Sequence, residues 1–176
     1  YLIICLVMNL YECEAKKLLN QHGIEVPSGF EYHRHGALDP FNAIQFPVVA
    51  KAQVLAGRRQ KEGGIAFIHT RDELRPSLEQ LFSRRIAGLR IDFVRIEEKL
   101  NLEKEYYISY TYDTEYSSPL VTFSPCGGID IEETASISPH LIYKIPFDTR
   151  IGLQASDIDH MLARAGVPDE DKEALG

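Results

Sequence analysis

The chain has 176 residues, of which 44% are hydrophobic, so it is long enough to bury a sizeable core as one domain or as two small lobes. Its formal net charge of -7 argues against a general nucleic-acid or anionic-membrane surface, because both need a broad basic face. We therefore expect neither nucleic acid nor a membrane as a partner. Any anionic ligand must be held by a local group of cations.

Residues 1–7 are apolar but too short to span a bilayer, and they lack the basic flank and cleavage site of a signal peptide. A helix start follows directly at Met8. We interpret residues 1–7 as an extension, either translated upstream of the usual initiator or left from cloning, and 8–176 as the folded domain.

Three cysteines, Cys5, Cys13 and Cys126, form no CxxC pair and leave one unmatched. This pattern favours reduced thiols in a cytosol-like compartment over a disulfide framework.

The first half of the chain mixes helices and strands without a regular βαβ repeat. Asn9 and Glu12 offer acceptors for the free amides of a helix start, and Gly23 ends that helix. Thr70 and Glu73 repeat the capping pattern further along. Hydrophobic patterning predicts strands over 30–33, 47–54 and 64–68, a weak helix over 37–44, and an amphipathic helix from 70 through 86.

Strand signals continue into the second half. A strand is predicted over 91–96, and 105–112 alternates as a half-buried antiparallel strand does, with its partner over 120–123. A polar turn at 117–119 suits the connection between them. The mixed order of elements predicts an α+β fold rather than a doubly wound sheet.

Beyond Gly128 the chain reads as irregular until Ser156, which can cap a helix that Gly166 ends. Residues 169–175 begin like a further helix.

The densest functional signal lies between Lys51 and Gly64, where four cations occupy one strand, loop and return strand. Glycines in the loop let backbone amides approach a polyanion, which is what a triphosphate requires. Lys51 ends an apolar strand, so it is partly desolvated and needs a negative partner. The alternative is a lysine that extends its charged end into solvent beside an exposed basic hairpin tip. These residues alone favour neither the phosphate site nor this alternative.

Glu97 and Glu105 form the second candidate group, one at the end of a predicted strand and one at the start of the next. Carboxylates in such places can accept hydrogen bonds from ribose hydroxyls or an adenine amino group. The neighbouring run of Glu and Lys residues makes a solvated charged segment the default interpretation.

Other reactive side chains carry less signal. His33 and His35 share one face of a strand but have no third metal ligand at a recognised spacing. Cys126 has no neighbouring base to activate it, and His140 has no visible acid or nucleophile partner. We predict no metal site and no catalytic residue in this chain.

Five segments, in order and at near-matching spacing, resemble the ATP-grasp β subunits of acid-CoA ligases, with succinyl-CoA synthetase the best match. The resemblance runs from Met8 to about Asp148. It is carried by Met8-Asn9-Leu10-Tyr11-Glu12 with Ala15-Lys16, by Val48 to Val54, by Gly57 to Gly64, by Glu97 with Glu105-Tyr106-Tyr107, and by Gly127 to Glu132 with Pro139-His140-Leu141-Ile142.

The resemblance implies a two-lobed ATP-grasp fold with antiparallel sheets and flanking helices, which clamps ATP or GTP. It places Lys51 on phosphate, Arg59 in the glycine-rich loop, and Glu97 and Glu105 on the nucleoside. In that family the nucleotide phosphorylates a histidine on a partner α subunit, and the phosphoryl group passes to a carboxylic acid that CoA then captures. Mg²⁺ neutralises charge in the full-length family. Such a protein is expected in the cytoplasm, or in the mitochondrial matrix of a eukaryote.

Departures from the family pattern affect the loop and the nucleotide contacts. Arg58 and Gln60 replace two glycines, which costs about 1 kcal/mol or more at each position if φ must be positive there. Leu100 stands near a polar nucleotide contact, and Cys126 stands where the family has an acidic residue. The binding residues predicted with the resemblance are Lys51, Arg58, Arg59, Gln60, Glu97, Leu100 and Glu105.

The chain stops before the segment that binds Mg²⁺ in the family and before the domain that completes acid and CoA binding. We therefore expect an incomplete ATP-grasp domain that is inactive alone. Two alternatives stay open: a degenerate, non-catalytic lobe that docks onto an α-like subunit, and the ATP-grasp part of a citryl-CoA or malyl-CoA type ligase.

Overall fold

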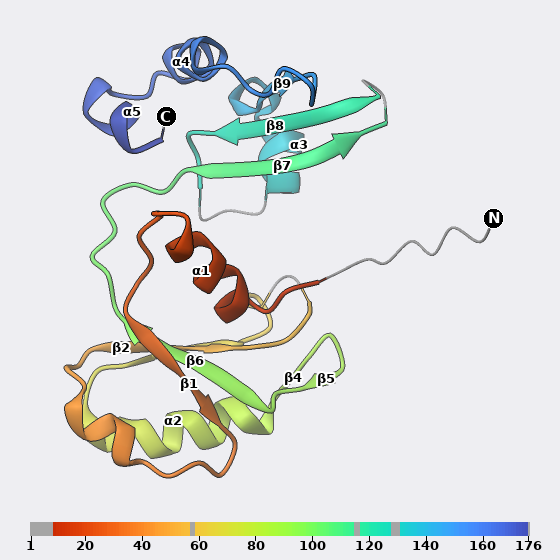
Figure 1. Ribbon diagram of the computed structural model, residues 1–176. Coiled ribbons are helices and arrows are strands. Elements are labelled where there is room, and N and C mark those ends of the chain that lie inside the picture. Colours follow the sequence, from red (N-terminus) through yellow and green to blue (C-terminus); the bar gives the residue numbers. More distant parts are fainter. Residues whose placement is uncertain (1–8, 57–58, 115–116, 128–130, 176) are drawn as a thin grey trace. The chain divides into compact units, whose positions relative to one another are not determined.

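The computed structural model describes residues 9–56, 59–114, 117–127 and 131–175. The chain divides into two compact units, unit 1 up to Asn101 and unit 2 from Leu102. Each unit combines an antiparallel sheet with helices (Figure 1). This confirms the predicted α+β class.

The sheet of unit 1 has the order β1-β6-β2-β3, and all neighbours are antiparallel. Its strands are β1 (Gly29–His33), β2 (Val48–Ala52), β3 (Ile65–Ile68) and β6 (Phe93–Glu98). Successive side chains of a strand point to opposite faces, so Ala50 and Ile96 enter the core while Lys51 and Glu97 project from the other face. The sheet therefore has one apolar and one charged face.

Helix α2 (Arg71–Ser83) covers the apolar face, and α1 (Glu12–Gln21) lies on the other side of the sheet (Figure 1). Helical spacing places the four buried side chains of α2 on one stripe, namely Leu74, Leu78, Leu81 and Phe82. They join Val48, Ile68 and Val94 in one buried cluster. Burying each such side chain stabilises the fold by about 1.5 to 3 kcal/mol.

Helix α2 ends earlier than predicted. It runs through Pro76 and stops at Ser83, after which Arg85–Ile86 (β4) pairs with Leu89–Arg90 (β5). Ala87 and Gly88 both have positive φ, which forms the tight turn between these short strands.

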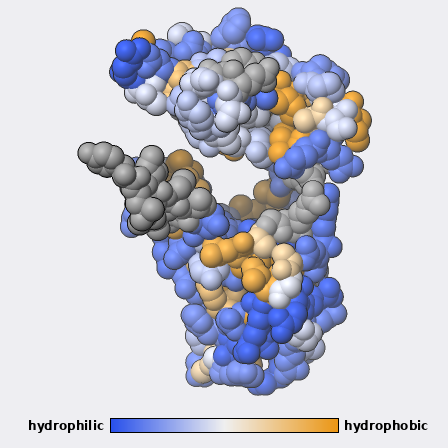
Figure 2. All heavy atoms as spheres, turned by 90° about the vertical axis from the view of Figure 1, so that its right-hand side faces the viewer, coloured by the Kyte–Doolittle hydropathy of each residue, from blue (hydrophilic) through white to orange (hydrophobic). Residues whose placement is uncertain are grey.

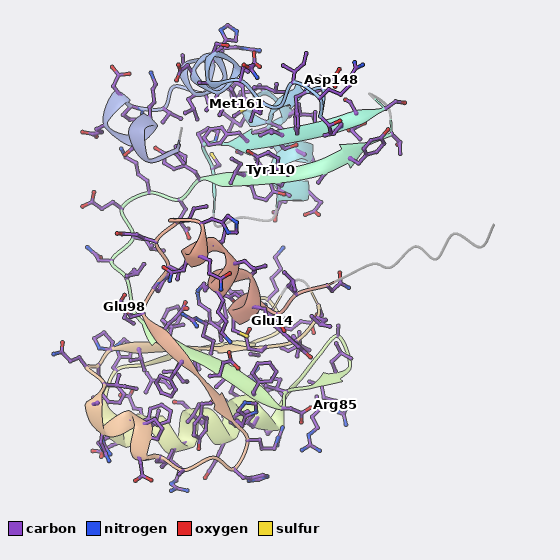
Figure 3. All side chains as sticks on the ribbon, viewed as in Figure 1. Glu14, Arg85, Glu98, Tyr110, Asp148 and Met161 are labelled. Carbon is purple, nitrogen blue, oxygen red and sulfur yellow. The ribbon has the colours of Figure 1, made fainter. Side chains whose placement is uncertain are left out.

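The expected helix starts are partly wrong. Helix α1 begins at Glu12, and Glu14 (labelled in Figure 3), rather than Glu12, accepts the amide of Tyr11 at 2.8 Å. Glu73 does accept the amide of His69 at 2.8 Å, in front of α2. The predicted weak helix is a 3-10 helix, η1 (Asp39–Ala43), which buries Phe41.

Unit 2 contains a three-stranded antiparallel sheet in the order β7-β8-β9. The hairpin of β7 (Tyr107–Asp113) and β8 (Ser118–Ser124) confirms the predicted strand pair, although β8 begins inside the predicted turn. Helix α4 (Ala155–Arg164) buries Met161 (Figure 3) and Leu162 in one cluster with Val121 and Phe123.

Burial of β7 differs from the expected half-buried pattern. Its apolar face remains open, with Ile108 50%, Tyr110 63% and Tyr112 66% exposed. The strand lies at the edge of the sheet, whereas β8 occupies the centre and has its apolar residues covered.

The sequence predicted an irregular segment before α4, and this prediction is wrong. It contains α3 (Ile131–Ile137), the 3-10 helix η2 (Pro139–Leu141) and β9 (Tyr143–Pro146). The cap of α4 is Gln154 rather than Ser156, and a last helix, α5 (Asp169–Leu175), follows Gly166. Strand β9 is only four residues long and ends at Pro146, which weakens its strand signal.

Among the described residues, every helix is too short or too polar to cross a membrane.

Candidate nucleotide site

Lys51 and Glu97 lie on neighbouring strands of unit 1 and form an ion pair through Lys51 Nζ and Glu97 Oε1. The register aligns Lys51 with Arg95 and Val49 with Glu97, so the lysine reaches diagonally across the charged face. The negative partner that the sequence required for Lys51 is therefore Glu97 itself.

Six side chains form what we call the charge cluster: Lys16, Lys51, Arg59, Arg95, Glu12 and Glu97. Glu97 receives Lys16 Nζ at 2.5 Å and Arg95 Nε at 2.9 Å on its second oxygen. Glu12 lies 2.9 Å from Lys16, 3.5 Å from Lys51 and 2.9 Å from Arg59. Four cations against two carboxylates leave a formal charge of +2 in a chain of net charge -7. This is the local cation group that an anionic ligand requires.

Burial divides the charge cluster into a fixed part and an accessible part. The side chains of Glu97 and Arg95 are 2% and 8% exposed, whereas Lys51 and Arg59 are each 26% exposed. Lys51, which the resemblance places on phosphate, and Arg59 of the loop are thus the most exposed cations of the charge cluster.

The carboxylates of the charge cluster are held ionised. Burial raises the pKa of Glu97, but hydrogen bonds and attraction from Lys16 and Lys51 outweigh it, so the pKa lies below its ordinary value. Burial likewise raises the pKa of Glu12, and Lys16, Lys51 and Arg59 bring it below the ordinary value. Burial lowers the pKa of Lys51, and Glu97 and Glu12 more than reverse this effect. All three groups therefore remain charged at neutral pH.

The loop between β2 and β3 directs Arg59 into the charge cluster. Arg59 Nη1 donates to the carbonyl of Ala52 at 3.0 Å, and the Arg59 carbonyl accepts the amide of Gly64 at 2.7 Å. Gln53, buried after β2, accepts the amide of Cys13 at 3.0 Å and so connects α1 with the sheet.

Beside Glu12 and Arg59 lies an open hollow of about 600 Å³, whose other walls are Asn9, Leu10, Val54, Leu55 and Ala56. Figure 2 shows hydrophobic residues gathered next to hydrophilic ones on the visible face of unit 1. A second hollow of about 400 Å³ is lined by Glu97 and Glu98 with Ser28, Gly29, Phe30, Ile44, Gln45, Val48 and Ile96. Both hollows are large enough to take part of a nucleotide.

The remaining predicted residues lie elsewhere. Arg58 falls outside the described residues. Gln60 is exposed in a turn and is absent from the described non-glycine residues with positive φ, so the expected backbone cost does not arise there. Leu100 is 47% exposed and follows β6.

Glu105 belongs to unit 2 and precedes β7 instead of starting it. Its carbonyl accepts the amide of Gly127 at 2.8 Å, and a Cβ on Gly127 would lie 2.6 Å from the Glu105 carbonyl carbon. The glycine at this point is therefore required by the close approach of two backbones.

Three members of the charge cluster were not predicted from the sequence as binding residues: Glu12, Lys16 and Arg95. Glu12 and Lys16 are spaced i, i+4 on one helix, a pair that sequence alone can indicate. Arg95 and Glu97 lie two residues apart on β6 and therefore share one face of the strand, which is a spacing that the sequence also offers.

Metal ligands do not gather among the residues that the structure describes, since no group of three or more His, Cys, Asp or Glu side chains could hold an ion there. His33 instead stacks on Phe93, with ring centroids 5.2 Å apart.

Comparison with known proteins identifies close relatives. The chain is 41% identical over 143 residues to the succinate-CoA ligase [ADP-forming] subunit β of Methanocaldococcus jannaschii, which covers 81% of this chain but only 39% of that protein. A second relative, subunit β 1 from Archaeoglobus fulgidus, is 36% identical and covers 93% and 43% of the two chains. The chain therefore spans about two fifths of these relatives.

Solved structures share the fold. ATP citrate lyase from Methanothrix soehngenii, solved with citrate and coenzyme A, superposes with a TM-score of 0.68 at 21% identity and covers 95% of this chain and 40% of its own. The model of the ATP-grasp domain family matches residues 9–175. The chain is thus a member of the ATP-grasp family.

Proposed function

We propose that this chain is the nucleotide-binding part of an acid-CoA ligase β subunit of the succinate-CoA ligase type, and that the charge cluster receives the phosphates of ATP or GTP. The observation that supports this most directly is the formal +2 charge of the cluster, with Lys51 and Arg59 at its accessible side. Preorganised cations of this kind stabilise a transferring phosphoryl group mainly by position and charge.

Lys51 is suited to phosphate because Glu97 orients it without neutralising the cluster. Glu97 Oε1 holds Lys51, and its other oxygen holds Lys16 and Arg95. A contact from Glu97 to the nucleoside, as the resemblance implies, has to compete with these cations. We therefore assign Glu97 chiefly to positioning, and we keep Glu105 as the proposed nucleoside contact.

The complete protein would pass the phosphoryl group through a histidine of a partner α subunit to a carboxylic acid, with CoA as the final acceptor. Supporting this step is a related fold from Ca. Korarchaeum cryptofilum, an acetyl-coenzyme A synthetase solved with a phosphorylated phosphohistidine segment, at TM-score 0.62 and 18% identity. The higher identity to succinate-CoA ligases favours succinate over acetate or citrate as the acid class.

A non-catalytic docking lobe is the second candidate. It is favoured by one observation: every cation of the charge cluster already has a carboxylate partner within the chain. Under this alternative the cluster is a structural network, and phosphate has no place in it.

Binding of ATP and GTP to this chain, measured by equilibrium dialysis with and without Mg²⁺, tests the proposal. Lys51→Ala and Arg59→Ala should each weaken binding at least about tenfold, as expected for the loss of a charge-assisted contact to phosphate. Lys17→Ala is the matched control, because Lys17 is exposed and pairs with Glu31 outside the cluster. Equal affinity in all four proteins would reject the nucleotide assignment and favour the docking lobe.

A further inference from the structure

Glu12 holds the two cations that the proposed function assigns to phosphate. Its Oε2 lies 2.9 Å from Arg59 Nη2, and its Oε1 lies 3.5 Å from Lys51 Nζ. A carboxylate that bridges two cations in this way makes the same kind of charge-assisted contacts as two oxygens of a phosphate group.

The two carboxylates of the charge cluster differ in access. Glu97 is 2% exposed and lies on a central strand, enclosed by Lys16, Lys51 and Arg95. Glu12 is 19% exposed, sits in the first turn of α1 and lines the open hollow of about 600 Å³ together with Arg59. A ligand can reach Glu12 without opening the sheet, whereas Glu97 cannot leave without disrupting β6.

Electrostatics make Glu12 a competitor for an incoming polyanion. Its negative charge reduces the cluster from three net positive charges to two, and it occupies positions next to Lys51 and Arg59. A phosphate that binds these cations either displaces the carboxylate or lies close to it, and both cost free energy. Lys51 keeps its contact with Glu97 in either case.

We infer that Glu12 is a placeholder anion, which orders Lys51 and Arg59 while no nucleotide is bound and which the phosphates displace. This inference rests on the proposed function, because it concerns the same cations. Under this inference Glu12 lowers the affinity for nucleotide, because it competes with the phosphates. In return it keeps Lys51 and Arg59 in position for phosphate while the site is empty.

Glu12→Gln is the decisive variant, since it removes the charge and keeps the shape. We expect it to tighten binding of both ATP and inorganic tripolyphosphate by about fivefold or more, the lower end of typical coupling between sites. Glu31→Gln is the matched control, because Glu31 pairs with Lys17 outside the cluster. It should change affinity less than twofold. Unchanged or weaker binding by Glu12→Gln would overturn the inference.

A second measurement does not depend on that variant folding. In the wild-type chain labelled with ¹³C at glutamate Cδ, the Glu12 carboxylate signal, assigned from Glu12→Asp, should shift when tripolyphosphate is added. The Glu97 signal should move less. A Glu12 signal that stays fixed at saturating tripolyphosphate would contradict displacement.

The Lys51, Arg59 and Glu12 variants together separate the placeholder role of Glu12 from phosphate binding by the charge cluster. If Lys51→Ala and Arg59→Ala weaken nucleotide binding while Glu12→Gln leaves it unchanged, the phosphate assignment holds and the placeholder role is wrong. If neither alanine variant affects binding, the proposed function itself fails.

Discussion

Gly29 lies directly opposite Glu97 in the antiparallel pairing of β1 with β6, and the space between the two strands admits no side chain at residue 29. A Cβ on Gly29 would lie 2.2 Å from the carbonyl oxygen of Ile96 and 2.8 Å from Glu97 Cβ. Because both neighbours belong to a central strand, neither can move far without disturbing the charge cluster.

Gly29→Ala should therefore destabilise unit 1. Overpacking of this kind costs about 1 to 3 kcal/mol in the free energy of unfolding. Urea unfolding followed by circular dichroism measures the loss. Ser28→Ala is the control, since Ser28 is exposed and binds Glu98 through its backbone amide and carbonyl, which the substitution keeps. Similar stability of the two variants would show that β1 and β6 can move apart to admit the added methyl group.

Glu97→Ala should be more damaging than the same change at its neighbour Glu98, which lies at the exposed end of β6 (Figure 3). Removing Glu97 leaves Lys51, Lys16 and Arg95 without their shared buried partner, and breaking a buried ion pair costs about 3 to 5 kcal/mol. Glu98→Ala removes one contact to a backbone amide and should cost less than about 1 kcal/mol. Chemical denaturation of both variants checks the difference, and equal losses would mean that Glu97 contributes no more than a surface carboxylate.

Stability of unit 1 should fall in acid through the same carboxylates. The pKa values of Glu12 and Glu97 lie below the ordinary 4.5, because their cationic neighbours outweigh the opposing effect of burial. A lowered folded pKa means that the stabilising contribution is complete above pH 4.5 and is lost as the pH falls through the folded value. Lys51 has a raised pKa, so its contribution is present below pH 10.5 and disappears only above it.

Unfolding free energies of wild type and Glu97→Gln, measured from pH 7 down to pH 3, test this sign. Their difference should be constant near neutrality and should shrink below about pH 4.5. Glu79→Gln serves as the control, because Glu79 is 70% exposed and lies outside the cluster. If the difference in unfolding free energy between wild type and Glu97→Gln stays constant down to pH 3, Glu97 has the same pKa in the folded and unfolded states and the prediction is wrong.

Gly127→Ala should disturb the segment that carries Glu105. The added methyl group would lie 2.6 Å from the Glu105 carbonyl carbon and 2.8 Å from the Tyr106 amide nitrogen, so the hydrogen bond between the two backbones cannot survive unchanged. We expect a loss of about 1 to 3 kcal/mol in the stability of unit 2. Cys126→Ala, one residue away, keeps the hydrogen bond from its backbone amide to Ser124 Oγ and is the matched control. Hydrogen exchange at Tyr106 and Tyr107 localises the effect, and unchanged protection there would contradict it.

Sequence patterns predicted most of the elements because their periods are local. The apolar stripe of α2, the strand that carries Lys51 and the hairpin of β7 with β8 follow from spacings of a few residues. The two-residue strands β4 and β5 are shorter than a recognisable period, and β9 ends at Pro146, which weakens its strand signal.

By itself, the sequence determined the class of the fold and the strand that carries Lys51, predicted over 47–54 and observed as Val48–Ala52, and it singled out Lys51 and Glu97 as candidate binding residues. Tertiary structure alone decided that these two residues form an ion pair, and that Glu12 and Lys16 join them. Lys16 and Glu97 are 81 residues apart in the chain. Contacts at such a separation depend on how α1 packs against the sheet and on strand register, and no local spacing of residues encodes either.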